Sequence, residues 1–417
     1  MSSDNKGGLM GWIDARIPLT RTMEKHVTKY YAPKNFNFFY VFGVFAMILF
    51  VNQIVTGIWL TMSYVPTAEE AFHSVEYIMR DVQWGWLIRY MHSTGASMFF
   101  VVIYLHMFRA LLYGSYQKPR ELIWIFGMSI YLLLMAEAFM GYVLPWGQMS
   151  YWGAQVIISL FGAVPVIGDP LVEWIRGDYL ISGITLNRFF ALHVIALPLV
   201  LAGLVFLHIV ALHEVGSNNP DGVDIKKNLD ENGVPVDGIP FHPYYTLGKD
   251  LVGIVIFLMV FFGIIFFFPT AGGFFLERAN FEAADPLTTP ENIHPVWYFG
   301  AFYSILRAMD FDLFFIEAKL LGVLTMGAAI AIMFVLPWLD RSPVRSWRYK
   351  GPISRIGIVV FAIAFMILTW LGIQPVTTLN TILAQVCTVI YFAFFLGMPF
   401  YTKYEKTKPV PERVTNR

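Results

Sequence analysis

The segments WLIRYMHSTGASMFFVVIYLHMFR at 86–109 and RFFALHVIALPLVLAGLVFLH at 188–208 decide the fold. Each is apolar and long enough to cross a membrane as an α-helix. Each also carries two histidines, 14 positions apart in the first segment and 15 in the second: His92 and His106, then His193 and His208. An α-helix turns about 100° and rises about 1.5 Å per residue, so 14 residues return a side chain to nearly the same face roughly 21 Å further along. Each segment is therefore predicted to present histidines at two depths.

Ionisable side chains inside a membrane are costly, so each one is taken as a functional residue whose partner has to be identified. A single intramembrane histidine is more often a packing residue. Two pairs with matched spacing favour a shared ligand, because each histidine then faces another at the same depth. An alternative from a different class of protein is a secondary transporter, in which such histidines relay protons.

The composition places the chain among polytopic membrane proteins. Of its 417 residues, 57% are hydrophobic and only 14% are charged, which exceeds the usual apolar content of soluble domains. The net charge is zero and gives no indication of a nucleic-acid partner. The single cysteine, Cys387, excludes an internal disulfide, an all-cysteine iron–sulfur ligand set and covalent haem attachment through C-x-x-C-H.

Eight apolar runs are long enough to cross about 30 Å of hydrocarbon; they lie at roughly 38–62, 87–112, 122–143, 184–212, 248–268, 316–337, 354–372 and 379–400. An even number of crossings places both termini on one side. Lys and Arg gather in the segments on that side, which predicts that both termini are cytoplasmic. These cations are Lys6, Arg16, Arg21, Lys25, Lys29, Lys34, Lys118, Arg120, Arg341, Arg345, Arg348, Lys350, Lys403, Lys406, Lys408, Arg413 and Arg417.

Five regions follow from this pattern. We expect a cytoplasmic segment with an interfacial helix at 1–37, a four-helix bundle with a structured outer loop at 38–212, and a polar, mobile cytoplasmic connection at 213–247. Four further helices with their own structured outer loop occupy 248–400, and 401–417 is a cytoplasmic tail. The predicted fold is an all-α membrane protein with eight transmembrane helices, of which the first four form a bundle around the histidines.

The topology fixes how the histidines pair. Both histidine helices run from the outer face inward, so His92 and His193 lie near the outer surface. His106 and His208 lie near the inner surface. Cofactor sites in helical bundles are built from inward side chains on facing helices. Two facing histidines at each level predict two non-covalent haems, and an iron bound on both axial sides has no open position, so the expected chemistry is electron transfer.

Glycines on the other two helices of the bundle share this register. Two are expected level with the outer haem and two, each 14 positions earlier, level with the inner haem: Gly57 and Gly141, then Gly43 and Gly127. Glycine permits the closest approach of a backbone to a ligand, although small residues also serve helix packing in membranes. Two cations on the membrane-surface side are candidates to bind haem propionates, or are arginines that reach the membrane surface: Arg89 and Arg109.

Six motifs make the chain similar to cytochrome b of the ubiquinol–cytochrome c oxidoreductase, the respiratory cytochrome bc complex. They are WLIRYMHSTGASMFF at 86–100, LHMFRALLYGSY at 105–116, GYVLPWGQMSYWGA at 141–154, RFFALH at 188–193, HEVGSNNP at 213–220 and IHPVWYF at 293–299. The resemblance runs from about residue 12 to residue 400. All eight predicted helices lie in one chain, as in the respiratory form of the family.

The resemblance implies a mechanism. Quinol is oxidised near the outer face, and one electron passes to a Rieske iron–sulfur protein and then to a membrane-anchored c-type cytochrome. The other electron crosses both b haems and reduces quinone near the inner face, which contributes to the proton-motive force. The resemblance further implies a dimeric complex in the bacterial cytoplasmic (inner) membrane.

It also implies two quinone sites. The residues expected at the outer site are Tyr142, Trp152 and Gly153 from the first outer loop, and Pro295, Trp297, Tyr298 and Tyr303 from the second. Those expected at the inner site are His213, Ser217, Lys249 and Asp250. Several of the inner residues could instead be solvated helix ends, and Asp250 could simply favour a helix amino terminus.

Two departures from the family pattern bear on these sites. The spacing of 15 between His193 and His208 replaces the respiratory pattern of 14, so the helix must compensate, for which Pro198 is a natural kink site. Val296 stands where the family has an acid that would take a proton from quinol. We hypothesise that Glu137, one turn before Gly141, replaces this acid, with hydrogen bonding to a neighbouring helix as the alternative. Glu291 is a weaker candidate.

A closer alternative is a haem b membrane anchor of a dehydrogenase, which would lack the paired outer quinol site. The segments GYVLPWG and PVWY argue against it. The sequence leaves open whether the quinone is ubiquinone or menaquinone, and which further subunits attach.

Overall fold

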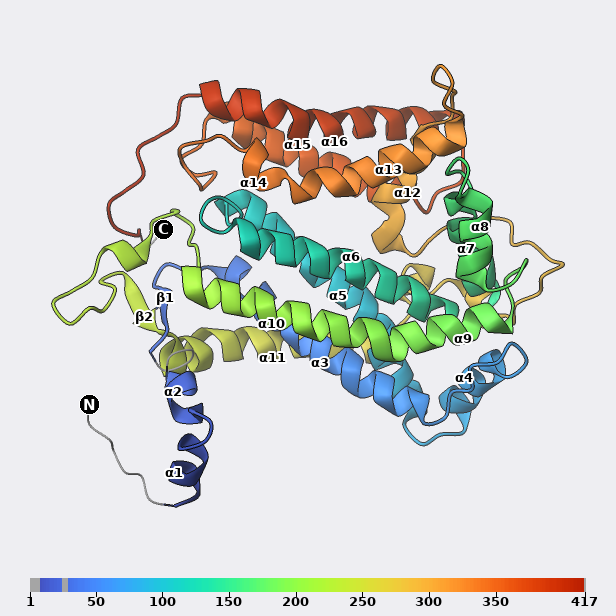
Figure 1. Ribbon diagram of the computed structural model, residues 1–417, viewed down its shortest axis with the longest axis horizontal. Helices are drawn as coiled ribbons and strands as arrows, with labels where there is room; N and C mark the ends of the chain where they lie inside the picture. The colour runs from blue at the N-terminus through green and yellow to red at the C-terminus, as the bar shows by residue number, and fades with distance from the viewer. Residues whose placement is uncertain (1–7, 25–28, 416–417) are drawn as a thin grey trace.

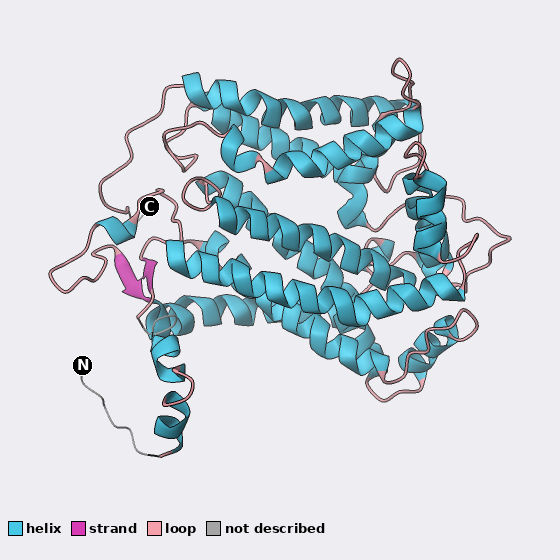
Figure 2. Ribbon diagram, in the orientation of Figure 1, coloured by secondary structure: helices cyan, strands magenta, loops and turns pink. Residues whose placement is uncertain are grey.

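The computed structural model describes residues 8–24 and 29–415, and their ordered structure is almost entirely helical (Figure 2). Lys6, Lys25 and Arg417 of the predicted cytoplasmic cations lie outside the described residues. The helices are α1 (Leu9–Asp14), α2 (Leu19–Met23), α3 (Phe42–Thr61), α4 (Ala71–Arg80), α5 (Gly85–Tyr113), α6 (Glu121–Val143), α7 (Gln148–Phe161), α8 (Gly168–Arg176), α9 (Gly183–Ala191), α10 (Leu197–Val215), α11 (Leu251–Phe267), α12 (Gly300–Ala308), α13 (Ala318–Phe334), α14 (Leu336–Leu339), α15 (Pro352–Leu371) and α16 (Thr378–Tyr404).

Irregular helical turns and one short sheet complete the described structure. Two π-helical segments, Leu192–Ala196 and Phe241–Asp250, precede α10 and α11. Short 3₁₀ turns lie at Phe38–Tyr40, Ile225–Lys227, Ala271–Gly273, Arg278–Phe281 and Trp297–Phe299. Strands β1 (Tyr31–Pro33) and β2 (Gly238–Pro240) pair antiparallel.

Seven helical segments of the described chain are long and apolar enough to cross a membrane: 38–61, 85–113, 121–143, 183–215, 241–267, 352–371 and 378–404. In hydrocarbon every backbone polar group needs an internal partner, so continuous helices are the structures that apolar runs of this length can form. The seven segments coincide with seven of the eight predicted runs. The eighth run, 316–337, forms the shorter apolar helix α13, followed after Val335 by α14. The protein is an integral membrane protein.

The long helices lie side by side in two groups (Figure 1). In the first group α3 packs along α5, and α6 packs along α10. In the second group α15 packs along α16, and α12 contacts both. One core of buried apolar and aromatic side chains joins the groups; there Tyr104 of α5 donates a hydrogen bond to the backbone oxygen of Tyr298, 2.5 Å away.

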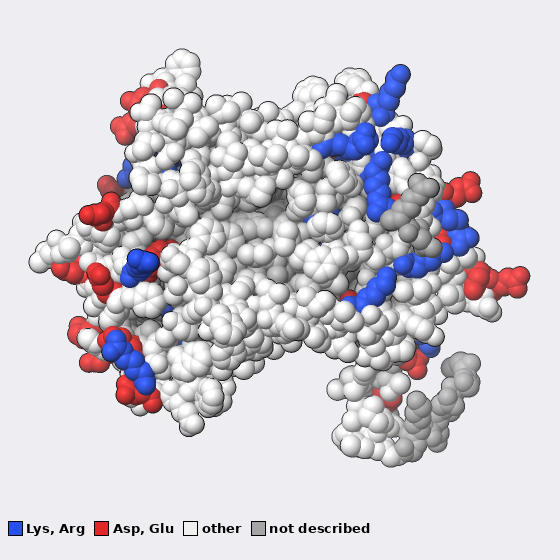
Figure 3. All heavy atoms as spheres, turned by 180° about the vertical axis from the view of Figure 1, so that it is seen from behind, with Lys and Arg blue, Asp and Glu red and all other residues white. Residues whose placement is uncertain are grey.

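The two ends of the molecule differ. Helix α1, strands β1 and β2 and the C-terminal tail lie at one end, which we call the termini end, and α4, α7 and α8 lie at the opposite end (Figure 1). On the face in Figure 3 most Lys and Arg side chains gather at the termini end, and a broad band without charged side chains separates the two ends. The two long loops, predicted to be structured, contain the short helices α7, α8 and α12.

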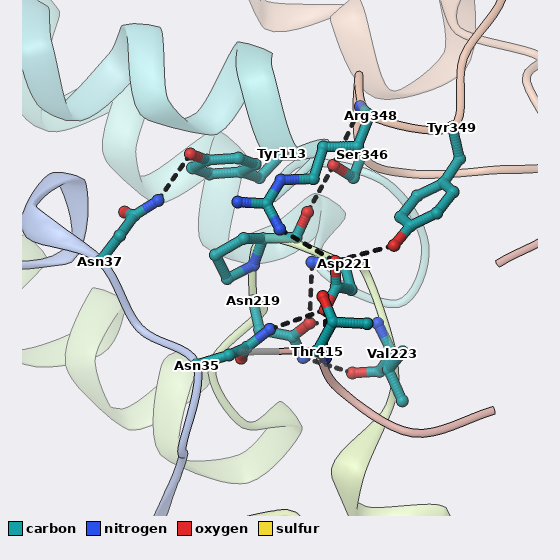
Figure 4. A network of polar contacts seen from close by, with 11 residues as sticks. Asn35, Asn37, Tyr113, Asn219, Asp221, Val223, Ser346, Arg348, Tyr349 and Thr415 are labelled. Atoms are coloured by element: carbon teal, nitrogen blue, oxygen red, sulfur yellow. Dashed lines mark hydrogen bonds and ion pairs between the residues drawn. The ribbon is translucent and has the colours of Figure 1, made fainter. Parts of the chain in front are cut away.

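The connection between α10 and α11, which the sequence analysis expects to be mobile, is instead tied into the fold. Asp221 and Asp237 are buried. Asp221 accepts hydrogen bonds from Asn35, Arg348, Tyr349 and Thr415 (Figure 4). Asp237 forms ion pairs with Lys34 and Arg413. Composition could not reveal this, because every partner comes from a distant part of the chain.

Hydrogen bonding determines the ionisation of both carboxyl groups. Burial alone would raise the pKa of Asp221, but the bonds from Thr415, Tyr349 and Arg348 hold it below its ordinary value. The pKa of Asp237 lies well below its ordinary value. The main cause is the hydrogen bond from Arg413, and the hydrogen bond from Lys34 adds to it. Two buried carboxylates therefore join the N-terminal segment, this connection and the C-terminal tail.

Candidate functional site

A π-helical turn absorbs the extra residue between His193 and His208. The turn Leu192–Ala196 contains His193 and lies between α9 and α10. In a π-turn hydrogen bonds run from i to i+5, so one residue is inserted without changing the register of the helix on either side. Pro198 follows the turn in the first positions of α10. The compensation predicted near Pro198 thus occurs in the turn just before it.

The four histidines meet in two pairs. The ring centroids of His92 and His193 are 6.1 Å apart, and those of His106 and His208 are 6.5 Å apart. A metal ion bound to one nitrogen of each ring, with bonds of about 2 Å, would hold the ring centres roughly 6 Å apart. The pairs are therefore spaced as two axial imidazoles on one iron require.

Each histidine lies against one of the four predicted glycines. A Cβ atom added at Gly43, Gly57 or Gly127 would lie 3.5, 3.2 or 3.3 Å from Cε1 of His106, His92 or His208, respectively. A Cβ atom at Gly141 would overlap the imidazole of His193. Glycine on α3 and α6 thus allows the histidines of α5, of the π-turn and of α10 to approach the neighbouring backbones.

The Nδ1 atoms of the first pair face hydrogen-bond acceptors. Nδ1 of His92 lies 2.9 Å from Oγ1 of Thr56. Nδ1 of His193 lies 2.9 Å from the backbone oxygen of Glu137 and 3.0 Å from its Oε1. When Nδ1 donates its proton, Nε2 is left with a free lone pair, which is the form that binds a metal.

The second pair lies among unpaired polar atoms. Nη2 of Arg109 lies 3.3 Å from Nδ1 of His106, and its guanidinium lies over the ring of Tyr40. Among the described residues, five buried polar atoms of this region have no hydrogen-bond partner: Nδ1 of His208, Nε of Arg109, Nη1 of Arg120, Oη of Tyr40 and Oδ1 of Asn218. Three of these atoms are donors, so the region suits a negatively charged group. The sequence did not predict a role for Tyr40 or Asn218, and Arg120 was predicted only as a cytoplasmic cation.

A cavity of about 720 Å³ surrounds the first pair. Its lining includes both histidines with Gly57 and Gly141, and Arg89 on α5. Glu137, Tyr142, Val296 and Tyr298 also border it. The structure therefore brings together the first histidine pair and part of the predicted outer site.

The other residues predicted for the outer site do not border the cavity. Of the described residues, Trp297 stacks on Phe274 with centroids 5.3 Å apart, and Tyr303 lies under the guanidinium of Arg307. Trp152 donates a hydrogen bond to the backbone of Asp285, and a Cβ at Gly153 would be 4.0 Å from the ring of Tyr142. These side chains and Pro295 do not line the cavity.

Glu277 is a buried acid at this site that the sequence analysis missed. Its carboxyl Oε2 accepts a hydrogen bond of 2.6 Å from the hydroxyl of Tyr142, and the side chain is only 7% exposed. Burial raises the pKa of the Glu277 carboxyl above its ordinary range. The available signal in the sequence was an acid directly after the apolar run GGFFL at 272–276.

The predicted inner-site residues also gather, at the termini end. His213 stacks on Tyr30 with ring centroids 4.6 Å apart, and Oγ of Ser217 lies 2.8 Å from the hydroxyl of Tyr30. Lys249 reaches the backbone oxygen of Phe36, and Asp250 is buried at the start of α11. Tyr30, which the sequence analysis did not select, is the residue that links His213 and Ser217.

The described residues contain no group of three or more His, Cys, Asp or Glu side chains that could hold a metal ion by themselves. A pair of histidines can instead supply the two axial ligands of an iron whose other four ligands belong to a porphyrin. The fold and these pairs are those of a polytopic membrane protein that binds haem.

Comparison with known proteins identifies the family. Residues 27–216 match the model of the family "Cytochrome b/b6/petB", and residues 283–392 match "Cytochrome b(C-terminal)/b6/petD". Cytochrome b of Allochromatium vinosum is 62% identical over 411 residues, which cover 98% of each chain. Cytochrome b of Rhodospirillum rubrum is 49% identical over 406 residues, 97% of this chain and 95% of that one. A solved structure of a hyperthermophilic respiratory Complex III has a TM-score of 0.86 and 36% identity, and covers 95% of this chain and 99% of its own.

The chain belongs to the cytochrome b/b6 family. Its function is that of the cytochrome b subunit of the quinol–cytochrome c oxidoreductase, respiratory Complex III, and membership of this family implies haem b. The two alternatives from the sequence, a secondary transporter and the haem b anchor of a dehydrogenase, are thereby excluded.

Proposed function

We propose that this chain holds two b-type haems, one between His92 and His193 and one between His106 and His208. The observation that carries the proposal is the spacing of the rings, 6.1 and 6.5 Å between centroids, with a glycine against each histidine. Bound in this way, the haems would supply one-electron transfer, because both axial positions of each iron are filled.

The residues around each pair have distinct tasks in this proposal. Thr56 and Glu137 accept hydrogen bonds from Nδ1 of the first pair and so orient both rings. Arg89 and Arg109 supply positive charge for the propionates of the outer and the inner haem. Nδ1 of a ligating His106 has to donate rather than accept, so Arg109 must turn away from its present contact. A propionate could then accept hydrogen bonds from Arg109 and from the unpaired donors of Arg120 and Tyr40.

We further propose eight membrane crossings, with α13 and α14 as the sixth. The first four crossings (38–212) then form the haem bundle, the last four (248–400) support the outer loop, and both termini lie in the cytoplasm with the connection 213–247 and the tail 401–417. The gathering of Lys and Arg at the termini end supports this orientation (Figure 3). The membrane would be the bacterial inner membrane.

The outer haem would occupy the part of the cavity around His92 and His193, and quinol would bind beside it, where Tyr142 and Tyr298 present polar groups and Val296 an apolar surface. Trp152, Gly153, Pro295, Trp297 and Tyr303 would position these residues from behind. Quinone would bind near His213, Ser217, Lys249 and Asp250, where Tyr30 completes a polar cluster. Glu137 as the acid that replaces the one missing at Val296 stays a prediction.

Oxidation of quinol in this cavity needs an electron acceptor outside the chain. The likeness to a Complex III structure supports a multi-subunit assembly. We propose a Rieske iron–sulfur protein and a membrane-anchored c-type cytochrome as the partners, in a dimer of the whole complex.

The test is the reduced-minus-oxidised optical spectrum of the complex with His193 replaced. His193→Leu should remove the outer haem and leave the inner one, because the rings of the inner pair come from other turns of α5 and α10. His73→Leu, at a side chain that is 67% exposed, is the control and should keep both haems. Selective loss of the inner haem in His193→Leu would contradict the pairing and the orientation.

A further inference from the structure

A quinol bound in the cavity beside His92 and His193 needs an acceptor for its protons. Quinol oxidation releases protons, and efficient transfer calls for an acceptor within hydrogen-bond reach, directly or through one intermediate group. Val296 borders the cavity and has no group that can accept a proton. Glu137 borders it too; its Oε1 is 3.0 Å from Nδ1 of His193 and its Oε2 has no partner among the described residues, so Glu137 is the rival acceptor in the experiment below.

Glu277 stands directly behind the cavity wall. The side chain of Tyr142 lines the cavity, and its hydroxyl donates to Oε2 of Glu277 over 2.6 Å. A distance this short is typical of a hydroxyl that donates to a carboxylate. The ring of Tyr142 thus connects the space where quinol would bind to a carboxylate that is itself shielded from solvent.

The loop that carries Glu277 is held rigidly against this tyrosine. Oδ1 of Asn280 accepts a hydrogen bond from the backbone N–H of Ser150 and lies 3.1 Å from its hydroxyl, which donates over 2.6 Å to the backbone oxygen of Tyr142. Gly147, three residues before Ser150, and Ala283, three residues after Asn280, form an isolated β-bridge. Three sets of contacts therefore fix the distance between Glu277 and Tyr142 without relying on their own hydrogen bond.

We propose that Glu277 is the final acceptor of a proton released in quinol oxidation, and that Tyr142 passes this proton from the quinol to Glu277. As the quinol O–H bond breaks, its proton bonds to the hydroxyl oxygen of Tyr142, and the original proton of Tyr142 bonds to Oε2 of Glu277. The electrons leave to the acceptor of the quinol–cytochrome c reaction, so the step itself moves only protons. The inference rests on the proposed outer quinol site.

The electrostatic surroundings suit this task. Burial raises the pKa of Glu277, which brings it nearer to a neutral working pH, while the hydrogen bond from Tyr142 and the charge of His294 oppose the effect. The titratable groups that face Glu277 are Tyr142 from α6, and Tyr298 and His294 from its own loop. Burial also raises the pKa of the Tyr298 hydroxyl, so it remains a neutral donor.

The experiment measures quinol–cytochrome c reductase turnover per haem in the intact complex between pH 5 and 9. Glu277→Gln keeps the size and a hydrogen-bond acceptor for Tyr142 but cannot take up a proton. We expect kcat to fall tenfold or more at neutral pH with the quinol KM within about twofold, and the acid limb of the pH profile to shift or disappear. Glu282→Gln, an exposed carboxyl on the same loop, is the matched control and should match the unaltered complex.

Rescue separates proton acceptance from a structural role. Val296→Glu in the Glu277→Gln background places a carboxyl directly in the cavity wall and should restore at least half of the lost turnover. If Glu277→Gln merely loosened the loop, Val296→Glu would restore nothing, and that result would overturn the inference. So would a Glu277→Gln complex with normal kcat and an unchanged pH profile, or a pH profile that shifts only in Glu137→Gln.

A last variant tests the quinol site on which the inference rests. Val296→Trp fills the part of the cavity next to Tyr142 and Tyr298, away from the histidine pair, so it should abolish turnover in complexes that keep both haem bands. Normal turnover in haem-replete Val296→Trp would refute the outer quinol site itself. Loss of turnover there, together with a normal Glu277→Gln, would refute only the role of Glu277.

Discussion

Adding a methyl group at each of the four glycines should impair haem binding in an order that the structure fixes. The space between each glycine and its histidine differs: a Cβ at Gly43 would lie 3.5 Å from the ring of His106, an ordinary van der Waals contact. The corresponding contacts at Gly57 and Gly127, 3.2 and 3.3 Å, require the histidine to move by a few tenths of an ångström. At Gly141 the added atom overlaps the ring of His193.

The free-energy cost of each substitution follows from two opposing effects. In an exposed helix interior, Ala is more favourable than Gly by about 1 kcal/mol, whereas overpacking costs typically 1 to 3 kcal/mol. Gly43→Ala should therefore be close to neutral, and Gly57→Ala and Gly127→Ala should cost about 1 kcal/mol or less. For Gly141→Ala the overlap should outweigh the helix term and leave a net cost of roughly 1 to 2 kcal/mol, about tenfold in occupancy of the outer haem. Gly141→Leu should abolish it.

The assay is the haem content of the purified complex, resolved into outer and inner haem by redox titration of the optical bands. Gly203→Ala is the matched control, because the space around Gly203 on α10 is open and the substitution should leave both haems in place. Full outer-haem content in Gly141→Ala, or a larger loss in Gly43→Ala than in Gly141→Ala, would refute the assignment of these glycines to the histidine pairs.

Two further predictions concern the termini end and the π-turn. Asp237→Asn should release the C-terminal tail, detected as faster limited proteolysis near Arg413, at a cost of roughly 1 to 3 kcal/mol for lost charged hydrogen bonds. Because the pKa of Asp237 is depressed in the folded protein, this docking should be complete above about pH 4 and weaken as the pH falls further; a tail equally protected at pH 3 and 7 would contradict it. Deleting Ile195, which is 60% exposed, should convert the π-turn to α-helix and keep both haems. Deleting Phe206 instead should displace His208 or the buried Leu201 by about 100° and reduce the inner haem; equal haem content in both deletions would refute this.

Periodicity predicted the parts of the fold that depend on local sequence. The apolar runs became helices close to the predicted bounds, because backbone in hydrocarbon has few alternatives. The shared spacing of histidines and glycines predicted which side chains meet, since it depends only on the geometry of the α-helix.

The residues that the sequence could not supply depend on contacts between distant segments. Glu277 looks like an ordinary loop acid until the structure places it against Tyr142, 135 positions away. Asp221 and Asp237 looked like the charges of a polar loop, and their burial follows only from partners such as Arg348 and Arg413. Tyr40 and Asn218 were missed for the same reason, because an unpaired buried atom can be recognised only once its surroundings are known.

The position of the π-turn follows from what the other three helices of the first group require. The glycines of α3 and α6 and the histidines of α5 all repeat at 14 positions, so α10 can match them at both levels only if one of its 15 residues is absorbed. A uniform α-helix would rotate His208 by about 100° away from Gly127. An inserted residue disturbs packing least where the helix surface is free, and Ile195 in the turn and Leu199 just after it are 60% and 69% exposed. The widened turn therefore lies next to His193, where its extra residue faces outward and the remaining α10 keeps the register that brings His208 to His106.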